Sequence, residues 1–557
     1  MGTFFNKRIS RRDFIKITAA TTAALTTDWN SVSAMAGAIG PKEKFPVVVI
    51  GAGLGGLSSA AIFARNGFPV TLIEQHDVPG GYATSFDREE GRFTFDVSLH
   101  ATSGVAGGPM KEIFEETGIL NKVEMVELPE LCRIITPDYD MTWPQKKPEA
   151  VIEKLSGLFP AESNGIRDFF GQMMEILDEA MKPVDPDSWW DRLTFPITHR
   201  QMWAVRALTL GDMLDMHVRD QKLKCFLSAF WAYYGLPPSK LSGFLYAIAT
   251  AAFMRFGGYY VRHRSQDLSN ALVDAIEQSG GRVMLETQAV GIKMEEKAVS
   301  GVILSDGQML PAGVVVSNAS VPATMTMLAK DQALENYSDH AQTYLQRLKT
   351  YRPSLSTFIV WLGLNQEIRG KIKGYEIFCA PHYDPEAAYQ AALSCDPERS
   401  GLGVTIYDNA FLGYSRPGTS TVTLIMISGY GPWRRFEADY LAERKEAYLK
   451  EKERIMEILI SKAEQMVIPG LRSMIEVKEA ATPLTNLRYT KNPEGAIYGY
   501  EQTLDNSFMN RIQSSTPFKG LYLASAWGGP GGGYEPCLDA GRKAFTAFVK
   551  DWEDEKI

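Results

Sequence analysis

Apolar and polar positions fall into blocks near the N-terminal end of the chain, and these blocks predict a βαβ unit. Val47–Ile50 is a short run of β-branched residues, residues 57–64 form a small-residue helical segment, and Val70–Ile73 is a second apolar run. The first run leads straight into glycines, and the second ends on an acidic residue. Strand, glycine-rich turn, helix and second strand in this order are typical of a dinucleotide-binding fold.

The turn between the first strand and the helix carries the candidate binding residues Gly51, Gly53 and Gly56. The first glycine permits the tight turn, the second lets the backbone approach a pyrophosphate, and the third lets the helix pack close to the sheet. The free N–H groups at the helix N-terminus favour a phosphate. Glu74 lies 18 residues beyond Gly56, where a carboxylate can accept the hydroxyls of an adenosine ribose. Together these residues predict a dinucleotide site.

A second glycine-rich turn at residues 79–86 helps to decide which dinucleotide binds. It contains Gly80, Gly81 and Ser85, and it lies just past the ribose-binding acid. A nicotinamide domain has no need of a turn at this place. Here the sequence resembles the phytoene desaturase, carotenoid isomerase and retinol saturase group of FAD-dependent oxidoreductases, in which such a turn lets the backbone reach the FAD diphosphate and ribityl chain.

The resemblance covers nearly the whole chain after the N-terminal segment, and it extends the predicted FAD site. It implies that the backbone of Val290 pairs with adenine. Near the C-terminus, residues 520–527 predict a strand, residues 530–533 a loop, and a helix is expected to begin near Glu535. In the group, this last helix points its N-terminus at the flavin pyrimidine and stabilises negative charge there. The resemblance therefore adds Trp527, Gly531, Gly532 and Gly533 to the cofactor-binding residues and makes FAD the expected cofactor.

The fold class that follows is α/β. We expect a Rossmann-like FAD-binding domain of the two-dinucleotide-binding-motif flavoprotein type, with an interleaved α+β substrate domain. The FAD-binding domain is then discontinuous, at residues 45–115, 257–325 and 482–550. The substrate domain takes residues 116–256 and 326–481. No second GxGxxG follows a strand elsewhere in the sequence, so electrons are expected to enter or leave at the flavin. The electron donor or acceptor stays open, with a quinone as one candidate.

Residues 1–36 predict an export signal outside the fold. A basic stretch, a weakly apolar segment at residues 19–25 and a small-x-small site at residues 34–36 follow one another, as in a cleavable signal. Within it, residues 10–16 (SRRDFIK) resemble the twin-arginine signal. The apolar segment is shorter than a membrane span requires. We therefore expect export by the twin-arginine pathway to the periplasm or cell envelope, with the cofactor already bound.

Charge and cysteine content narrow the set of partners. The formal net charge is −8, and residues 1–36 hold five basic and two acidic residues, so the chain without them carries −11. This balance argues against nucleic acid as a partner. The five cysteines have neither metal-ligand nor CxxC spacing. We predict mostly buried thiols and no metal site, with one disulfide left open.

The first half of the predicted substrate domain is rich in aromatic residues. They gather before a Pro-Pro pair: Phe226, Phe230, Trp231, Tyr233 and Tyr234. Residues 241–254 then run for 14 residues without a charge, which is too short to cross a bilayer. Buried helices explain this pattern most simply; an apolar tunnel, or a peripheral surface that dips into a membrane, is the sharper interpretation. The pair Trp189 and Trp190 allows the same two interpretations, a packed corner or an interfacial anchor.

Candidates for acid–base chemistry are few, and the catalytic side chains stay unassigned. His100 and Asp96 lie on the segment that leads toward the flavin, and Tyr259 and Tyr260 lie where the chain returns to the FAD domain. For His100 a structural role is the simpler interpretation.

The resemblance implies hydride transfer between a substrate carbon and flavin N5. The expected reaction is desaturation, saturation or isomerisation at carbon–carbon bonds of a hydrophobic, carotenoid/retinoid-like isoprenoid, and the sequence does not fix its direction. Two alternatives stay open: an amine-oxidase-like flavoenzyme and a non-catalytic electron-transfer flavoprotein.

Overall fold

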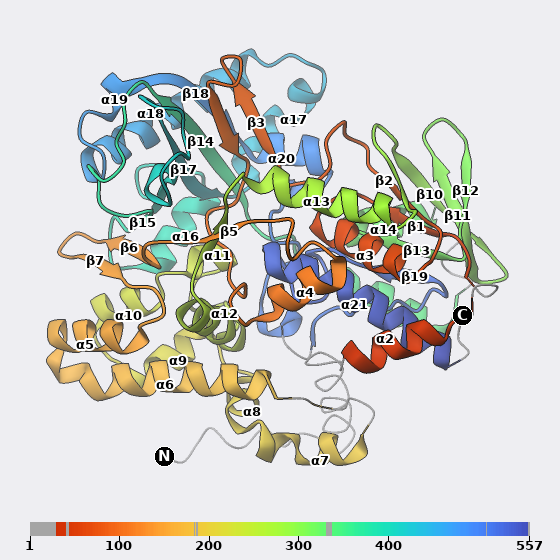
Figure 1. The fold of residues 1–557 in the computed structure, drawn as a ribbon. Coiled ribbons are helices and arrows are strands. Elements are labelled where there is room, and N and C mark those ends of the chain that lie inside the picture. The colour runs from red at the N-terminus through yellow and green to blue at the C-terminus, as the bar shows by residue number, and fades with distance from the viewer. Residues whose placement is uncertain are drawn as a thin grey trace.

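The predicted βαβ unit forms the centre of a parallel sheet in the computed structural model, which describes residues 29–40, 44–182, 184, 188–329, 337–507 and 510–554. The sheet has the strand order β19-β13-β1-β2-β9, and every neighbouring pair is parallel. Its strands are β1 (Val47–Ile50), β2 (Val70–Ile73), β9 (Arg282–Met284), β13 (Val314–Ser317) and β19 (Leu521–Leu523). Three segments that are far apart in the sequence therefore share one sheet, drawn in red, green and blue in Figure 1.

Helices pack against this sheet because each presents an apolar face to it. Helix α3 contacts α13, α21 and α4 as well as the strands. Phe63 of α3 and Phe545 of α21 meet edge to face, with ring centroids 4.8 Å apart, a favourable aromatic geometry. The helices are α3 (Leu54–Arg65), α4 (Pro109–Thr117), α13 (Ser265–Gln278) and α21 (Tyr534–Glu553).

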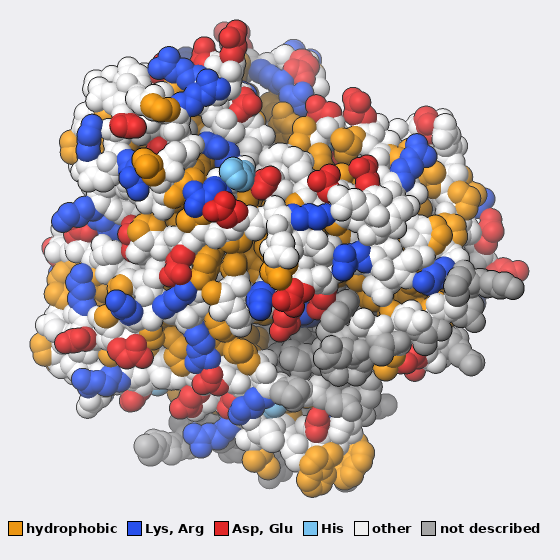
Figure 2. Space-filling view, viewed as in Figure 1, with side chains coloured by type: hydrophobic (Ala, Val, Ile, Leu, Met, Phe, Trp, Pro, Cys, Tyr) orange, Lys and Arg blue, Asp and Glu red, His pale blue; other side chains and the backbone are white. Residues whose placement is uncertain are grey.

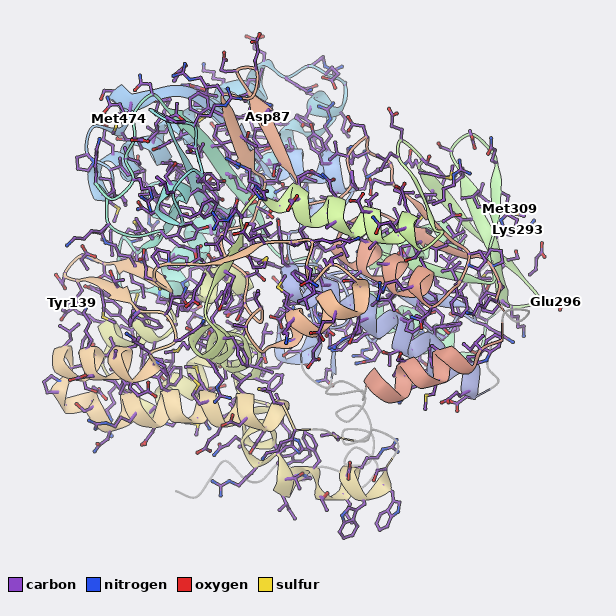
Figure 3. All side chains as sticks on the ribbon, in the orientation of Figure 1. Asp87, Tyr139, Lys293, Glu296, Met309 and Met474 are labelled. Atoms are coloured by element: carbon purple, nitrogen blue, oxygen red, sulfur yellow. The ribbon has the colours of Figure 1, made fainter. Side chains whose placement is uncertain are left out.

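A smaller antiparallel sheet flanks the parallel one on the side away from the second lobe (Figure 1). It consists of β10 (Ala289–Glu295), β11 (Ala298–Leu304) and β12 (Met309–Pro311). Figure 3 shows Lys293, Glu296 and Met309 at this outer edge, whereas Asp87 and Met474 lie on the other lobe. Helices α14 (Val321–Ala329) and α15 (Asp339–Leu348) follow in the chain, and α14 packs on β10.

The second lobe is built on a large mixed sheet of order β18-β14-β17-β16-β15-β6-β7. Helix α18 (Glu446–Met466) packs on β16 and β17. The strands are β6 (Cys132–Ile135), β7 (Asp140–Trp143), β14 (Ser356–Leu364), β15 (Glu376–Cys379), β16 (Leu402–Ile406), β17 (Ser420–Ser428) and β18 (Ile475–Ala481). The other helices of this part are α16 (Pro385–Leu393), α17 (Arg434–Leu441), α19 (Leu471–Met474) and α20 (Pro483–Thr490).

A helical bundle completes this lobe around the long amphipathic helix α6 (Ser163–Ala180), which contacts α5, α8, α9 and α12. Its members are α5 (Pro148–Leu158), α7 (Trp189–Thr198), α8 (Arg200–Val205), α9 (Leu210–His217), α10 (Gln221–Leu227), α11 (Trp231–Tyr234) and α12 (Gly243–Phe256). Two pairs of antiparallel strands lie between the lobes. One is the hairpin of β3 (Ser85–Arg88) and β4 (Phe93–Asp96), and the other pairs β5 (Met125–Glu127) with β8 (Tyr259–Val261). The interleaving of the chain is thus visible, while the exact domain boundaries stay a prediction.

The structure differs from expectation at the N-terminal segment. Residues 1–36 were expected to lie outside the fold, yet α2 (Trp29–Ala38) packs on α21. Val32 and Ala36, one helical turn apart, are buried in the same core cluster as Ile39, because together they form an apolar stripe. The boundary at residue 36 stays a prediction, and the twin-arginine residues 10–16 lie outside the described residues.

Two further expectations concern cysteines and membrane spans. All five cysteines lie in the described part of the chain and are free, and four of them are buried, as predicted for buried thiols. Among the described residues, no helix is both long and apolar enough to cross a membrane, and no group of side chains there has the arrangement of a metal site.

Candidate functional site

The glycine turn after β1 brings three segments of the chain together. Gly51 has φ +93° and follows the strand, and the N–H of Gly80 donates to the carbonyl of Ala52 at 2.7 Å. A Cβ atom at Gly55 would lie 2.1 Å from the carbonyl oxygen of Ala524, and one at Gly56 would lie 2.0 Å from that of Gly51. Glycine is therefore required at both positions for α3 to begin so close to the backbone that follows β1 and β19. In the described structure no side chain caps α3, so its N-terminal N–H groups are available to a phosphate.

Glu74 braces this turn from the end of β2. Its Oε2 accepts the backbone N–H of Ala52 at 2.7 Å, and its Oε1 accepts that of His76 at 3.0 Å. The side chain is buried. A carboxylate is suited to this place because it has lone pairs left for a ribose hydroxyl after two backbone donors are satisfied.

The second glycine turn is anchored by a buried carboxyl group, Asp96. Ser85 Oγ donates to Asp96 Oδ1 at 3.0 Å, the N–H of Ser265 donates to the same oxygen at 3.1 Å, and the Tyr260 hydroxyl donates to Oδ2. Burial raises the pKa of Asp96, and the hydrogen bonds from Tyr260, Ser265 and Ser85 oppose that rise. This network ties the β3–β4 hairpin to the N-terminus of α13, so Asp96, Tyr260 and Ser85 have a positioning role.

The C-terminal loop before α21 is held by Arg511, which sequence reasoning missed. Its guanidinium is buried and donates to the carbonyls of Ala526 at 3.0 Å and Gly529 at 2.9 Å, and to the side chain of Gln502 at 2.5 Å. Burial lowers the pKa of Arg511 to about 10. Trp527 donates from Nε1 to Asn492 at 3.1 Å. The loop is therefore fixed by side chains on both sides.

One continuous cavity of about 1350 Å³ connects these turns. Most of the predicted cofactor-binding residues lie on its wall: Gly51, Gly53, Glu74, Gly80, Gly81, Ser85, Val290, Trp527, Gly532 and Gly533. Val290 sits where the β10–β11 ladder shifts register. Gly56 and Gly531 are not on the wall: Gly56 lies beneath the first turn, and a Cβ at Gly531 would lie 2.6 Å from Nε2 of Gln502. The roles of all these residues toward FAD remain proposals.

The cavity continues from this end into an apolar chamber between the helical bundle and the large sheet. Phe230, Trp231, Tyr233 and Tyr234 line it, whereas Phe226 is buried in the core. Helix α12, which spans the uncharged residues, contributes Leu245 and Phe253 to the wall and packs its other face in the core. Both interpretations of this segment, buried helix and apolar wall, therefore hold.

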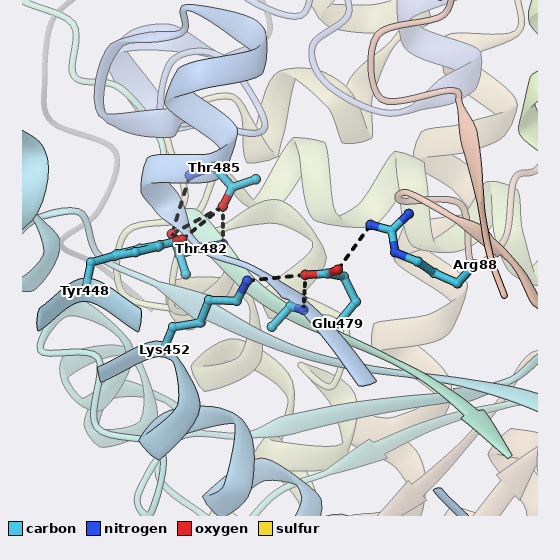
Figure 4. A network of polar contacts seen from close by, with 7 residues as sticks. Arg88, Tyr448, Lys452, Glu479, Thr482 and Thr485 are labelled. Atoms are coloured by element: carbon cyan, nitrogen blue, oxygen red, sulfur yellow. Dashed lines mark hydrogen bonds and ion pairs between the residues drawn. The ribbon is translucent and has the colours of Figure 1, made fainter. Parts of the chain in front are cut away.

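The rim of the cavity carries an ion-pair network, shown in Figure 4. Glu479 on β18 lies 3.1 Å from the guanidinium of Arg88 and 3.3 Å from the ammonium of Lys452. Burial opposes ionisation of Glu479, but the two cations outweigh it, and the pKa of Glu479 lies below its ordinary value. Beside it, the Tyr448 hydroxyl lies 3.1 Å from that of Thr482, which caps α20.

Among the acid–base candidates, His100 lies on the cavity wall; Asp96, Tyr259 and Tyr260 do not. His100 Nδ1 shares a hydrogen bond of 2.7 Å with Thr405 Oγ1, and its ring lies parallel to that of Tyr407. Burial lowers the pKa of His100 to about 4, so the ring is neutral at pH 7.

Comparisons with known proteins agree with this geometry. The family model described as "Flavin containing amine oxidoreductase" matches residues 54–545, and one for the twin-arginine translocation pathway signal sequence matches residues 8–27. The chain is 25% identical over 512 residues to the all-trans-retinol 13,14-reductase of Danio rerio, covering 86% of this chain and 82% of that protein. It is also 25% identical over 528 residues to the 4,4'-diapolycopene oxygenase of Methylomonas sp, covering 91% and 98%.

Among solved structures, a putrescine oxidase bound to putrescine superimposes with a TM-score of 0.59 at 12% identity, covering 92% of this chain and 99% of that chain. At this identity the likeness concerns the fold alone, and it confirms the predicted α/β fold class with a Rossmann-like FAD-binding domain. The glycine-lined cavity end fits a dinucleotide, and the cofactor is FAD. The chain carries a twin-arginine export signal, and it belongs to the flavin-containing amine oxidoreductase family, as an FAD-dependent oxidoreductase similar to retinol reductases and carotenoid-modifying enzymes.

Proposed function

We propose that this enzyme acts on carbon–carbon single or double bonds of a hydrophobic, carotenoid/retinoid-like isoprenoid, by desaturation, saturation or isomerisation. One observation carries the proposal: the cavity that begins at the glycine turns continues without a break into a chamber walled by aromatic and aliphatic side chains. A long apolar substrate gains most from such a wall, because burying its surface is the main source of its affinity.

The names of the relatives point to the same substrates. Those named above are a retinol reductase and a diapolycopene oxygenase, and a prolycopene isomerase of Daucus carota is 22% identical over 511 residues. The amine-oxidase alternative has support from the likeness of fold. The apolar chamber favours the isoprenoid over a small, strongly hydrated amine.

Several residues are placed to hold FAD. We propose that the N-terminus of α3 and the backbone of Gly53 bind the diphosphate, that Glu74 binds the ribose, and that Val290 meets the adenine. Gly532 and Gly533 precede α21, whose N-terminal end favours negative charge. FAD, when bound, supplies the capacity to accept or donate a hydride at N5.

The remaining residues position the substrate and exclude water. Trp361 lies on the wall and donates from its indole N–H to the carbonyl of Asp96 at 2.7 Å, so its ring orientation is fixed. Tyr498 lies between the substrate chamber and the last loop, since a Cβ at Gly532 would be 2.8 Å from its ring. These rings would place a flat, conjugated chain against the flavin end of the cavity.

We further propose that the exported enzyme works in the periplasm or cell envelope and touches a membrane peripherally. The exposed face of α7 supports this: Trp189, Trp190, Leu193 and Ile197 are each more than half exposed, and Figure 2 shows the apolar patch at the foot of the molecule. Tryptophan is enriched at membrane interfaces. A lipid-soluble quinone fits the same setting as electron partner.

The direct test adds isoprenoids such as all-trans-retinol and phytoene in detergent micelles, under anaerobic conditions, both to enzyme with oxidised flavin and to enzyme with reduced flavin. For desaturation we expect the oxidised flavin to be reduced and the product to have more double bonds. For saturation we expect the reduced flavin to be reoxidised and the product to have fewer double bonds. For isomerisation we expect a product with a changed double bond at an unchanged flavin oxidation state. Putrescine added to the oxidised enzyme, with a peroxide assay, tests the amine alternative.

A cavity variant sharpens this test. Ala249 lies on the chamber wall, on α12 and far along the chain from the glycine turns. We expect Ala249→Phe to keep its FAD and lose the response to isoprenoids, and Ala249→Ser to keep both. If no isoprenoid is converted by the wild type or changes its flavin spectrum, or if only amines do so, the proposal is wrong.

A further inference from the structure

Three polar side chains meet on one wall of the chamber: Glu376 on β15, Thr405 on β16, and His100. Glu376 and Thr405 are directly opposite each other in the antiparallel ladder, so their side chains leave the same face of the sheet at adjacent positions. Thr405 Oγ1 in turn lies 2.7 Å from His100 Nδ1. All three residues line the cavity.

The surroundings of this polar wall are uncharged. The large sheet turns alternate residues toward the chamber. Beside threonines such as Thr357 and Thr423, those on this face are hydrophobic: Ile359, Trp361, Phe378, Ile425 and Ile427. The residues between them face the core beneath α18, as Ile377 and Val404 do. Glu376 is thus an acid among uncharged side chains on this part of the sheet face.

Two polar groups on this wall lack partners. Glu376 is only 5% exposed, and its carboxyl makes no hydrogen bond or ion pair with any of the described residues. His100 Nε2 is also buried without a hydrogen-bond partner there. Buried polar groups are nearly always paired, and Glu479 in the same cavity follows this rule, because it pairs with two cations.

Both groups are neutral at pH 7. Burial raises the pKa of Glu376 to about 8 and lowers that of His100 to about 4. Burial also raises the pKa of Tyr498 and of Cys132, and the charge of Glu376 adds a smaller rise to both. A neutral carboxyl group donates one hydrogen bond and accepts others, so the wall matches an uncharged oxygen atom.

We propose that Glu376, with Thr405 and His100 beside it, binds an oxygen atom of the substrate. The substrate is therefore an isoprenoid alcohol or carbonyl compound, held by its oxygen on β15 while its hydrocarbon chain fills the chamber. This inference rests on the proposed isoprenoid function and adds the polar end of the substrate to it. A pure hydrocarbon leaves the Glu376 carboxyl buried and unpaired, which weakens its binding.

The test uses the FAD-loaded enzyme and a matched pair of probes, geranylgeraniol and the C20 hydrocarbon that lacks its hydroxyl. Dissociation constants are read from the change in flavin absorbance under oxidised, non-turnover conditions. We expect the wild type to bind the alcohol about tenfold more tightly, the equivalent of one hydrogen bond. Glu376→Leu should remove this preference and bind the hydrocarbon at least as well, and Glu376→Gln should retain part of it.

Glu479→Gln is the matched control. It removes a carboxylate from the same cavity, but one that already has two cationic partners, so the ratio of the two constants should not change. FAD content and melting temperature establish that each variant is folded. A second readout needs no turnover and is a difference spectrum between wild type and Glu376→Gln at pH 7, because other buried acids such as Glu535 and Glu116 also absorb as protonated carboxyl groups. The difference should contain the infrared band of one protonated carboxyl group, and this band should shift when the alcohol is added but not when the hydrocarbon is added.

The outcomes separate the two proposals. Equal affinity of the wild type for both probes, or a preference that survives Glu376→Leu, overturns the role of Glu376 while leaving the isoprenoid function intact. Failure of both probes to bind, with tight binding of geranylgeranylamine, overturns both, because Glu376 would then be an anion that pairs with an ammonium group. Absence of the infrared shift with a binding alcohol also contradicts the proposal.

Discussion

Replacing Glu74 by glutamine gives a graded test of the FAD site, because the structure fixes what each carboxylate oxygen does. One oxygen accepts the N–H of Ala52 and the other that of His76, and the remaining lone pairs face the cavity. Glutamine has a single acceptor oxygen and an NH₂ group. In Glu74→Gln, one of the two backbone N–H groups must therefore face another donor.

The substitution has two free-energy costs, one that is present in both the apoprotein and the FAD-bound protein and one that is present only when FAD is bound. The unpaired backbone donor costs about 1–3 kcal/mol with or without FAD. The lost charge-assisted bond to a ribose hydroxyl costs about 1.5–3 kcal/mol only when FAD is bound. The second cost corresponds to FAD binding that is about 10- to 150-fold weaker, and the first to a lower melting temperature of the apoprotein.

The assay is reconstitution of apoprotein with FAD, followed by flavin fluorescence, together with thermal unfolding of apo and loaded forms. Glu286→Gln is the control, because Glu286 is an exposed acid close to the same edge of the sheet and its replacement changes the charge by the same amount. If Glu74→Gln binds FAD as tightly as the wild type, Glu74 does not hold the ribose. If Glu286→Gln weakens FAD binding equally, the effect is one of overall charge.

Three further changes should have distinct outcomes. Gly56→Ala brings a Cβ to 2.0 Å from the carbonyl of Gly51, so it should cost at least about 1–3 kcal/mol by overpacking and give a protein purified with little flavin. Arg511→Lys removes the fork that holds the C-terminal loop, and we expect a reduced FAD-to-protein ratio after gel filtration. The Glu376 pKa is about 8 when folded and near 4.5 when unfolded, so the wild type loses stability as pH rises from about 4.5 to 8, up to roughly 5 kcal/mol. Relative to wild type, Glu376→Gln should melt at a higher temperature at pH 9 than at pH 5; an unchanged difference would contradict the burial argument.

The sequence predicted the parts of the fold that depend on local pattern. The bounds of β1 and β2 agree with the two apolar runs, and α21 begins at Tyr534, one residue before the expected start. Helix α3 begins at Leu54, earlier than the helical segment predicted at residues 57–64. Its first turn contains two glycines, which lower helix propensity but are required here by close packing against neighbouring backbone.

Residues whose roles arise from tertiary contacts could not be found in this way. Arg511 lies in an irregular segment without a motif, and its partners are set by the loop at residues 526–529. Gly531 belongs to a glycine run that is expected to touch FAD, yet a Cβ atom at this position would point toward Gln502. This direction is set by the backbone angles, which the sequence does not reveal. The buried stripe of α2 was missed because a cleavable signal and a short amphipathic helix share small, weakly apolar residues.

Glu376 shows where the limit of sequence reasoning lies. In the sequence it is a lone acid at the start of an apolar strand, and this pattern equally suits a strand end facing solvent. Glu376 is a candidate binding residue because the strand register places it opposite Thr405. Thr405 in turn bonds the ring of His100, which comes from a segment far away in the chain. The same residue type at Glu479 pairs with two cations and needs no ligand. Whether a buried acid has hydrogen-bond or ionic partners therefore depends on its neighbours in space, and a polar substrate atom gains most beside an acid that has none.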